Sequence, residues 1–407
     1  MTPMLYFRAS LLLVLLMPCA LHATGKMADP IRVGVLYSST GTMATSETRL
    51  KDALLVMIDQ QNERGGLLGR PLEAVVIDPM SNWTLYAEKA RQLIEREHVK
   101  VIFGCWTSAS RKAVKPVVEE LNGLLFYPVQ YEGREQSDNI FYLGAAPNQQ
   151  ALPAVRYLLE TMQIESWVLA GTDYVYPRTT NRMLVEFLLQ NGVPVEDIMI
   201  SYTPFAHADW QRTVADIRKF ASQRGKTAIV STINGDANVA FYRELAQQGV
   251  SADEIPVLAF SFGEGEANLM EDQLPVGHLS AWNYFMSIDS PENRAFIASL
   301  QQQSGGLVTV ANDPIEAQYI GFKLWMAAVN AVASTDTNKV RQAIIGLSVK
   351  NLSGGEAEML PNHHISKPAY IGRLGPDGQY EIIWKSLADI PGDPWIDPVS
   401  VEADKGH

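Results

Sequence analysis

The sequence predicts an α/β protein built as two Rossmann-like lobes with parallel sheets, joined by a multi-strand hinge. Its 407 residues exceed one ordinary hydrophobic core and indicate more than one lobe. Short apolar runs alternate with helical patterns, which is typical of parallel strands covered by helices on both faces. The alternation restarts after residue 144, so we expect a second unit of the same kind.

The first unit opens with an apolar strand at 31–37 and a helix in which Leu50, Leu54 and Ile58 recur on one face. We expect Thr45 or Ser46 to cap that helix. The unit continues with a strand at 72–77, a helix at 85–98, a strand from 101, a helix at 108–121, and strands from 124 and at 139–144.

The second unit repeats this order, and the chain then returns to the first. Its expected elements are helices at 153–162, 181–190, 209–222 and 238–248, and strands at 166–171, 197–202, 227–233 and 255–262. We expect a strand at 276–285 to lead back to the first lobe, followed by helices at 291–303 and 314–333. Turn residues between runs 369–374 and 380–384 predict a β-hairpin. The lobes are therefore expected at 29–146 with 282–350, and at 147–281 with 351–407.

The N-terminus has the pattern of a secretory signal peptide. Arg8 precedes the apolar run 9–17, and the small residues Ala20 and Ala23 follow it. The run is too short to span a membrane comfortably. We expect residues 1–23 to be removed and the mature protein to be periplasmic. Cys105 is then the remaining cysteine, which precludes an internal disulfide.

Several function classes are disfavoured by composition and motifs. A formal net charge of -12 argues against nucleic acid or an anionic membrane surface as partner. The sequence lacks a Gly-x-Ser-x-Gly elbow, a His-Glu-x-x-His helix and a phosphate loop, so we expect no enzyme. His363 and His364 are adjacent and would point to opposite faces of an extended segment, so we expect neither a metal site nor a cofactor.

Polar and aromatic residues follow two neighbouring strands of the first unit. Trp106, Thr107 and Ser108 follow the strand from 101, and the strand from 124 ends in Tyr127, Val129 and Gln130. Thr107 and Ser108 are good N-cap residues, and a helix start presents free backbone N–H groups. In open α/β sheets, small ligands bind in the crevice outside such strand ends.

The motifs at these strand ends resemble the urea and short-chain amide branch of the type I periplasmic solute-binding proteins. The resemblance covers essentially the whole mature chain and is carried by the segments 104–108, 111–114, 127–133, 144–150, 171–178, 282–285 and 362–364. It implies a two-lobed receptor that passes urea to the permease subunits of an ATP-binding-cassette (ABC) importer. It also implies ligand contacts from Trp106, Ser108, Tyr127, Val129, Tyr174 and Tyr176, with the second lobe adding Asn234, Asp236 and Glu264.

Urea explains these residue types, because it offers one carbonyl acceptor and four N–H donors on a flat, uncharged frame. We expect backbone N–H groups and hydroxyls near Ser108 to donate to the carbonyl, and the Val129 carbonyl with Asp236 or Glu264 to accept the N–H groups. The aromatic rings would pack on its faces. Taken alone, Ser108 and Asp236 are also ordinary helix caps. A receptor for short-chain amides or branched-chain amino acids, and a ligand-sensing protein coupled to a regulator, stay open as alternatives.

Overall fold

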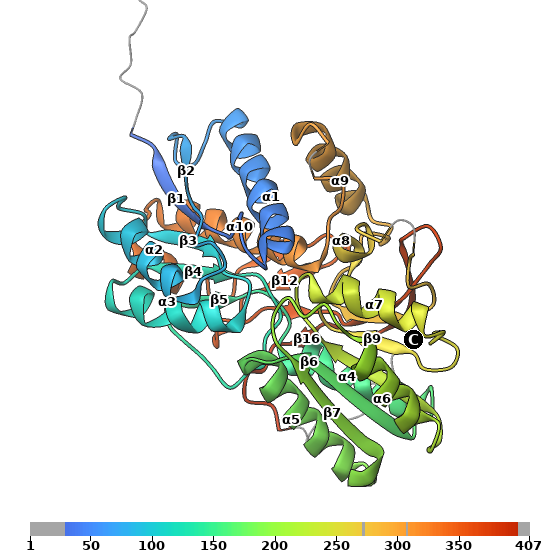
Figure 1. Cartoon of the computed structure of the whole chain (residues 1–407). Coiled ribbons are helices and arrows are strands. Elements are labelled where there is room, and N and C mark those ends of the chain that lie inside the picture. The colour runs from blue at the N-terminus through green and yellow to red at the C-terminus, as the bar shows by residue number, and fades with distance from the viewer. Residues whose placement is uncertain (1–28, 271–272, 307, 398–407) are drawn as a thin grey trace, which may run out of the picture.

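The computed structural model describes residues 29–270, 273–306 and 308–397, and the predicted signal peptide lies outside them. Two α/β lobes lie one above the other, the first in blue and cyan and the second in green and yellow (Figure 1). This confirms the predicted two-lobed α/β architecture.

The first lobe is built on a five-stranded parallel sheet of order β2-β1-β3-β4-β5. Its buried strands are apolar on both faces, as expected for a sheet covered by helices on each side. The strands are β1 (Ile31–Leu36), β2 (Leu72–Ile77), β3 (Val101–Gly104), β4 (Leu124–Tyr127) and β5 (Ile140–Tyr142). The helices are α1 (Ala44–Glu63), α2 (Trp83–Glu95), α3 (Ser108–Glu120), α9 (Pro291–Gln303), α10 (Asp313–Val332) and α11 (Thr337–Ala343).

The second lobe is built on a seven-stranded sheet of order β15-β14-β10-β9-β8-β6-β7. Its strands are β6 (Ser166–Thr172), β7 (Ile198–Thr203), β8 (Thr227–Thr232), β9 (Val257–Ala259), β10 (Leu279–Trp282), β14 (Tyr370–Leu374) and β15 (Tyr380–Lys385). Its helices are α4 (Ala151–Glu160), α5 (Val175–Gln190), α6 (Gln211–Ala221), α7 (Ala237–Gln247) and α8 (Glu264–Ala267). The predicted hairpin is confirmed, because β14 and β15 pair antiparallel.

Short elements complete the described chain. They are the strands β11 (Ser348–Lys350), β12 (Glu356–Glu358), β13 (Ser366–Lys367) and β16 (Ile390–Pro391), and the 3₁₀ helices η1 (Pro147–Gln149) and η2 (Val195–Asp197).

The strand expected at 276–285 is β10, which joins the second sheet between β9 and β14 before the chain crosses back to the first lobe. One local expectation is wrong, because neither Thr45 nor Ser46 caps the first helix. Helix α1 begins after Met43, without a side-chain cap. Ser46 lies inside that helix, where its hydroxyl donates to Glu266 of the other lobe.

The division of the lobes at residues 146, 281 and 350 stays a prediction. Packing bears on its last boundary, since Ala357, Met359 and Ile365 join the core of the first lobe.

Three chain segments cross between the lobes, and Asn283 lies where they meet. Asn283 follows β10 on the second crossing. Its Nδ2 donates to the Gln149 carbonyl on the first crossing (2.9 Å) and to the Pro368 carbonyl on the third (2.7 Å). Beside it, the buried Lys367 ammonium pairs with Glu316 at 2.7 Å and with Asp313 at 3.6 Å. The hinge is therefore a compact, polar and buried junction.

No helix in the described ranges combines the length and apolar character needed to cross a bilayer. Nor does that part of the chain bring three or more His, Cys, Asp or Glu side chains together as a metal site would require.

Candidate functional site

The first-lobe side of the site is built where β3 and β4 end. A Cβ on Gly104 would lie 2.6 Å from the Leu36 carbonyl oxygen, so only glycine fits there. Cys105 follows in the left-handed region with φ 68°, which turns the chain out of the sheet. Thr107 then caps α3 by accepting from the Ser110 N–H. The Tyr127 hydroxyl donates to the Trp106 carbonyl at 2.6 Å, which ties the two strand ends together.

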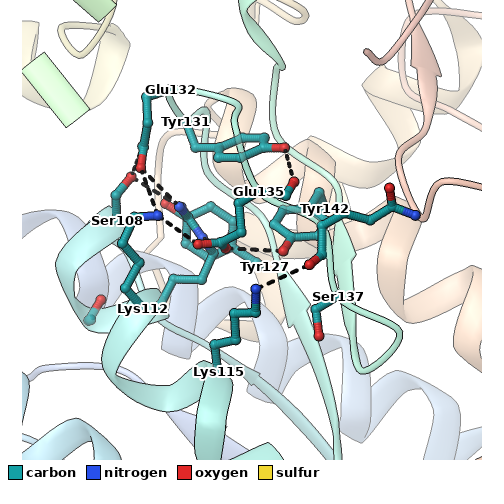
Figure 2. A network of polar contacts seen from close by, with 12 residues as sticks. Ser108, Lys112, Lys115, Tyr127, Tyr131, Glu132, Glu135, Ser137 and Tyr142 are labelled. Carbon is teal, nitrogen blue, oxygen red and sulfur yellow. Dashed lines mark hydrogen bonds and ion pairs between the residues drawn. The ribbon is translucent and has the colours of Figure 1, made fainter. Parts of the chain in front are cut away.

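Next to these strand ends lies a charge cluster that includes Lys112, Glu132 and Glu135 (Figure 2). Arg111 is at its centre. The Arg111 guanidinium is fully buried and donates to Glu135 (2.8 Å), Glu132 (3.3 Å) and the Ser108 hydroxyl (3.1 Å). Lys112 pairs with both carboxylates, at 2.7 Å to Glu135 and 3.5 Å to Glu132. Two cations therefore balance two anions inside the site.

Aromatic rings enclose this cluster. The Arg111 guanidinium carbon lies 4.8, 4.6 and 5.9 Å from the ring centres of Tyr127, Tyr131 and Tyr142, within the range of cation–π attraction. Burial alone would raise the pKa of the Glu135 carboxyl. The charges and hydrogen bonds of Arg111 and Lys112 outweigh burial and hold that pKa at about 2, so Glu135 stays ionised at neutral pH.

The second lobe contributes aromatic residues at the start of α5. Tyr174 precedes that helix and Tyr176 lies in its first turn, both buried. The Tyr174 ring packs against Phe205 of its own lobe (4.9 Å) and stacks with Trp83 of the first lobe (6.5 Å). Burial raises the pKa of Tyr174, and Tyr127 and Glu132 act on it in the same direction. Helix α3 of the first lobe contacts α5 of the second, which brings the two halves of the candidate site together.

Gln130 links the lobes directly. Its Nε2 donates to the Phe260 carbonyl (2.8 Å) and to the Ser261 hydroxyl (2.7 Å) of the second lobe. Its Oε1 is buried and has no hydrogen-bond partner among the residues that the structure describes. The same holds for the Tyr176 hydroxyl, although Gln130 and Ser261 lie close enough to lower its pKa against the effect of burial. Gln130 Oε1 is thus an acceptor, and the Tyr176 hydroxyl a donor, without a hydrogen-bond partner among the described residues.

The other expected contacts lie differently. Asn234 is buried, and its amide donates to the Thr232 carbonyl. Asp236 is exposed at the start of α7, without a side-chain cap bond. Glu264 is buried and accepts from the Met286 N–H, and burial raises its pKa to about 8. Val129 is buried directly beside Gly144, where an added Cβ would lie 2.0 Å from the Val129 carbonyl carbon. These four stay predictions as ligand contacts.

The two histidines pack on aromatic rings, in keeping with the expected structural role. His364 stacks on Tyr142 (4.6 Å, 2°) and contacts the Tyr131 hydroxyl through Nε2 at 2.6 Å. His363 stacks on Phe141 at 4.7 Å.

Sequence reasoning missed Arg111, Glu132 and Glu135 as parts of the site. A signal was present, since Arg111 lies one helical turn after Ser108 and therefore on the same helix face. It also missed Trp83, which is 41% exposed, as a contact between the lobes.

Comparison with known proteins identifies the family. Residues 31–400 match the model of the periplasmic binding protein domain. The chain belongs to this family. Its predicted membership of the type I periplasmic binding proteins is thereby confirmed, while the urea branch stays a prediction.

Individual relatives that match most of the chain share about a fifth of its residues. The chain is 21% identical over 398 residues to the Leu/Ile/Val-binding protein homolog 7 of Brucella melitensis, covering 93% of this chain and 97% of that protein. It is 32% identical over 125 residues to a protein named limonene hydroxylase from Geobacillus stearothermophilus, which is 31% of this chain and only 23% of that protein. A solute-binding protein of an ABC transporter from Rhodopseudomonas palustris HaA2, solved with p-hydroxybenzoic acid, shares the fold with a TM-score of 0.77 at 22% identity, covering 90% of this chain and 99% of that one.

Proposed function

We propose that this protein is a periplasmic receptor that binds urea between its lobes and delivers it to the permease of an ABC importer. The observation that carries the proposal is the open pair formed by Gln130 Oε1 and the Tyr176 hydroxyl. A buried polar group without a partner costs about 1–3 kcal/mol. A neutral amide supplies both missing partners, an N–H for the acceptor and a carbonyl for the donor.

The charge balance of the site supports a neutral ligand. An amino acid or an aromatic acid, as the names of the relatives suggest, would need an unpaired carboxylate or cation of the receptor. Arg111 and Glu132 already pair with each other. With a pKa of about 8, Glu264 is mostly protonated at neutral pH. The Asp236 carboxylate is exposed to solvent.

The small size of urea sets an upper limit on the affinity that we expect. Its four heavy atoms, at a ceiling of about 1.5 kcal/mol each, give roughly 6 kcal/mol, which corresponds to a Kd on the order of tens of micromolar. The rings of Trp106, Tyr127 and Tyr174 are available to cover its flat faces.

A branched-chain amino acid is the second candidate. The full-length similarity to a Leu/Ile/Val-binding homolog favours it, and Asp236 at the start of α7 is the carboxylate that would then hold the ammonium group.

Titration calorimetry with urea, acetamide, leucine and 4-hydroxybenzoate tests these proposals. We expect urea to bind and the two charged ligands to fail. Tyr176→Phe and Gln130→Met should each weaken urea binding about 5- to 100-fold. Gln150→Met is the matched control, because Gln150 donates to the same Phe260 carbonyl but is not one of the open groups. Absence of heat and of a thermal shift at millimolar urea would refute the proposal, and leucine binding would favour the second candidate.

A further inference from the structure

The hydrogen bonds of the Ser108 hydroxyl bear on which ligands the site prefers. Its hydroxyl donates to Glu132 Oε2 at 2.5 Å and accepts from Arg111 Nη1 at 3.1 Å. A hydroxyl has one proton and two lone pairs. The proton and one lone pair are therefore in use, and what Ser108 still offers is one lone pair.

Glu132 is held firmly in the arrangement that takes this proton. Its other oxygen, Oε1, accepts from Arg111 Nη2 at 3.3 Å and pairs with Lys112 at 3.5 Å. Its side chain is 2% exposed, so water does not compete for the carboxylate. Ser108 is equally buried, which fixes the direction of the hydroxyl.

This arrangement lies at the meeting of the lobes. Helix α3, which begins at Ser108, contacts α5 of the second lobe, and Tyr176 lies in the first turn of α5. Gln130 and Glu132 lie two residues apart in the segment that follows β4. The free lone pair of Ser108 therefore belongs to the same site as the open oxygen of Gln130.

We propose that Glu132 is a positioning residue that makes Ser108 an acceptor, so that the site selects ligands with N–H groups on both sides of a carbonyl. This rests on the proposed function and deepens it. It also reverses the role expected from sequence, in which Ser108 donates to the ligand carbonyl. Urea has N–H groups on both sides, whereas acetamide has a methyl group on one and would leave an acceptor unpaired. Urea should therefore bind about tenfold more tightly than acetamide.

Glu132→Gln is the decisive variant. Arg111 only donates, so it holds the amide oxygen of the new side chain and turns the NH₂ group toward Ser108. Ser108 then accepts from that group and is free to donate to the ligand. We expect the ratio of the urea and acetamide dissociation constants to fall from about tenfold to about twofold or less.

Glu135→Gln is the matched control, because Glu135 pairs with the same Arg111 and Lys112 without touching Ser108. It should leave the ratio near that of the wild type. In addition, Glu132→Gln should have no effect on the ratio once Ser108→Ala is present, because Glu132 acts through Ser108.

The outcomes separate the two proposals. Wild-type protein that binds no urea overturns the proposed function and this inference with it. Urea binding with the same ratio in wild type and Glu132→Gln, or an equal change of ratio in Glu135→Gln, overturns the inference alone.

Discussion

Replacing Arg111 by methionine should destabilise the first lobe more than any exposed arginine substitution. The side chain is fully buried and makes three hydrogen bonds, to Ser108, Glu132 and Glu135. Methionine fills most of the space but leaves two buried carboxylates with Lys112, which is 37% exposed, as their remaining ion-pair partner. Removing one partner of a buried ion pair costs about 3–5 kcal/mol. Because whole domains are stable by about 5–15 kcal/mol, this is a large share.

Unfolding in guanidinium chloride, followed by circular dichroism, measures this loss. Urea is unsuitable as the denaturant because it is the proposed ligand. Arg91→Met is the control, since Arg91 pairs with Glu95 and Glu120 at the surface and should lose little stability. If Arg111→Met lost no more stability than Arg91→Met, the charge cluster would have no structural role and the reasoning would be wrong.

Three further predictions follow from local geometry. Burial raises the pKa of Glu47 from 4.5 to about 8, so the folded protein keeps a proton that the unfolded chain releases, and stability should decline as pH rises through this window. Glu47→Gln should flatten the decline in thermal unfolding, and an unchanged slope would contradict the assignment. Trp83→Ala should speed urea release several-fold in stopped-flow measurements with little change in melting temperature, because its ring contacts two aromatic rings of the other lobe; an unchanged release rate would exclude this contact from closure. Gly144→Ala should lower the free energy of unfolding by about 3 kcal/mol, because its Cβ would lie 2.0 Å from the Val129 carbonyl carbon. Gly355→Ala, whose Cβ would have its nearest contact at 3.5 Å, should be nearly neutral. Equal losses of stability for the two variants in calorimetry would argue against the close approach at Gly144.

Much of the fold could be predicted because buried parallel strands are short apolar runs between helical patterns. The approach of Trp106 to Tyr127 followed from the same logic, since neighbouring parallel strands end at one edge of the sheet. The start of the first helix could not be predicted in this way. Thr45 and Ser46 are typical cap residues, but Ser46 lies inside α1 and its hydroxyl donates to Glu266, a partner that only the packing of the two lobes supplies.

The charge cluster escaped prediction for a different reason. An arginine inside a helix usually lies on the solvated face, and sharing a helix face with Ser108 does not by itself mark Arg111 as buried. Its partners Glu132 and Glu135 stand 21 and 24 residues further along the chain and meet it only when β4 is laid beside β3. The proposed acceptor role of Ser108 depends on that meeting, whereas the donor role expected from the sequence considered Ser108 without Glu132.

The amide of Asn283 has a mechanical consequence. Since one side chain is bonded to carbonyls on both of the other crossings, no crossing can shift without pulling on its neighbours. Such a junction couples the crossings, so we expect them to move together when one lobe rotates relative to the other. Under the proposed function, this coupling would transmit the binding of so small a ligand to surfaces of the receptor that lie far from the site, where the permease can detect it.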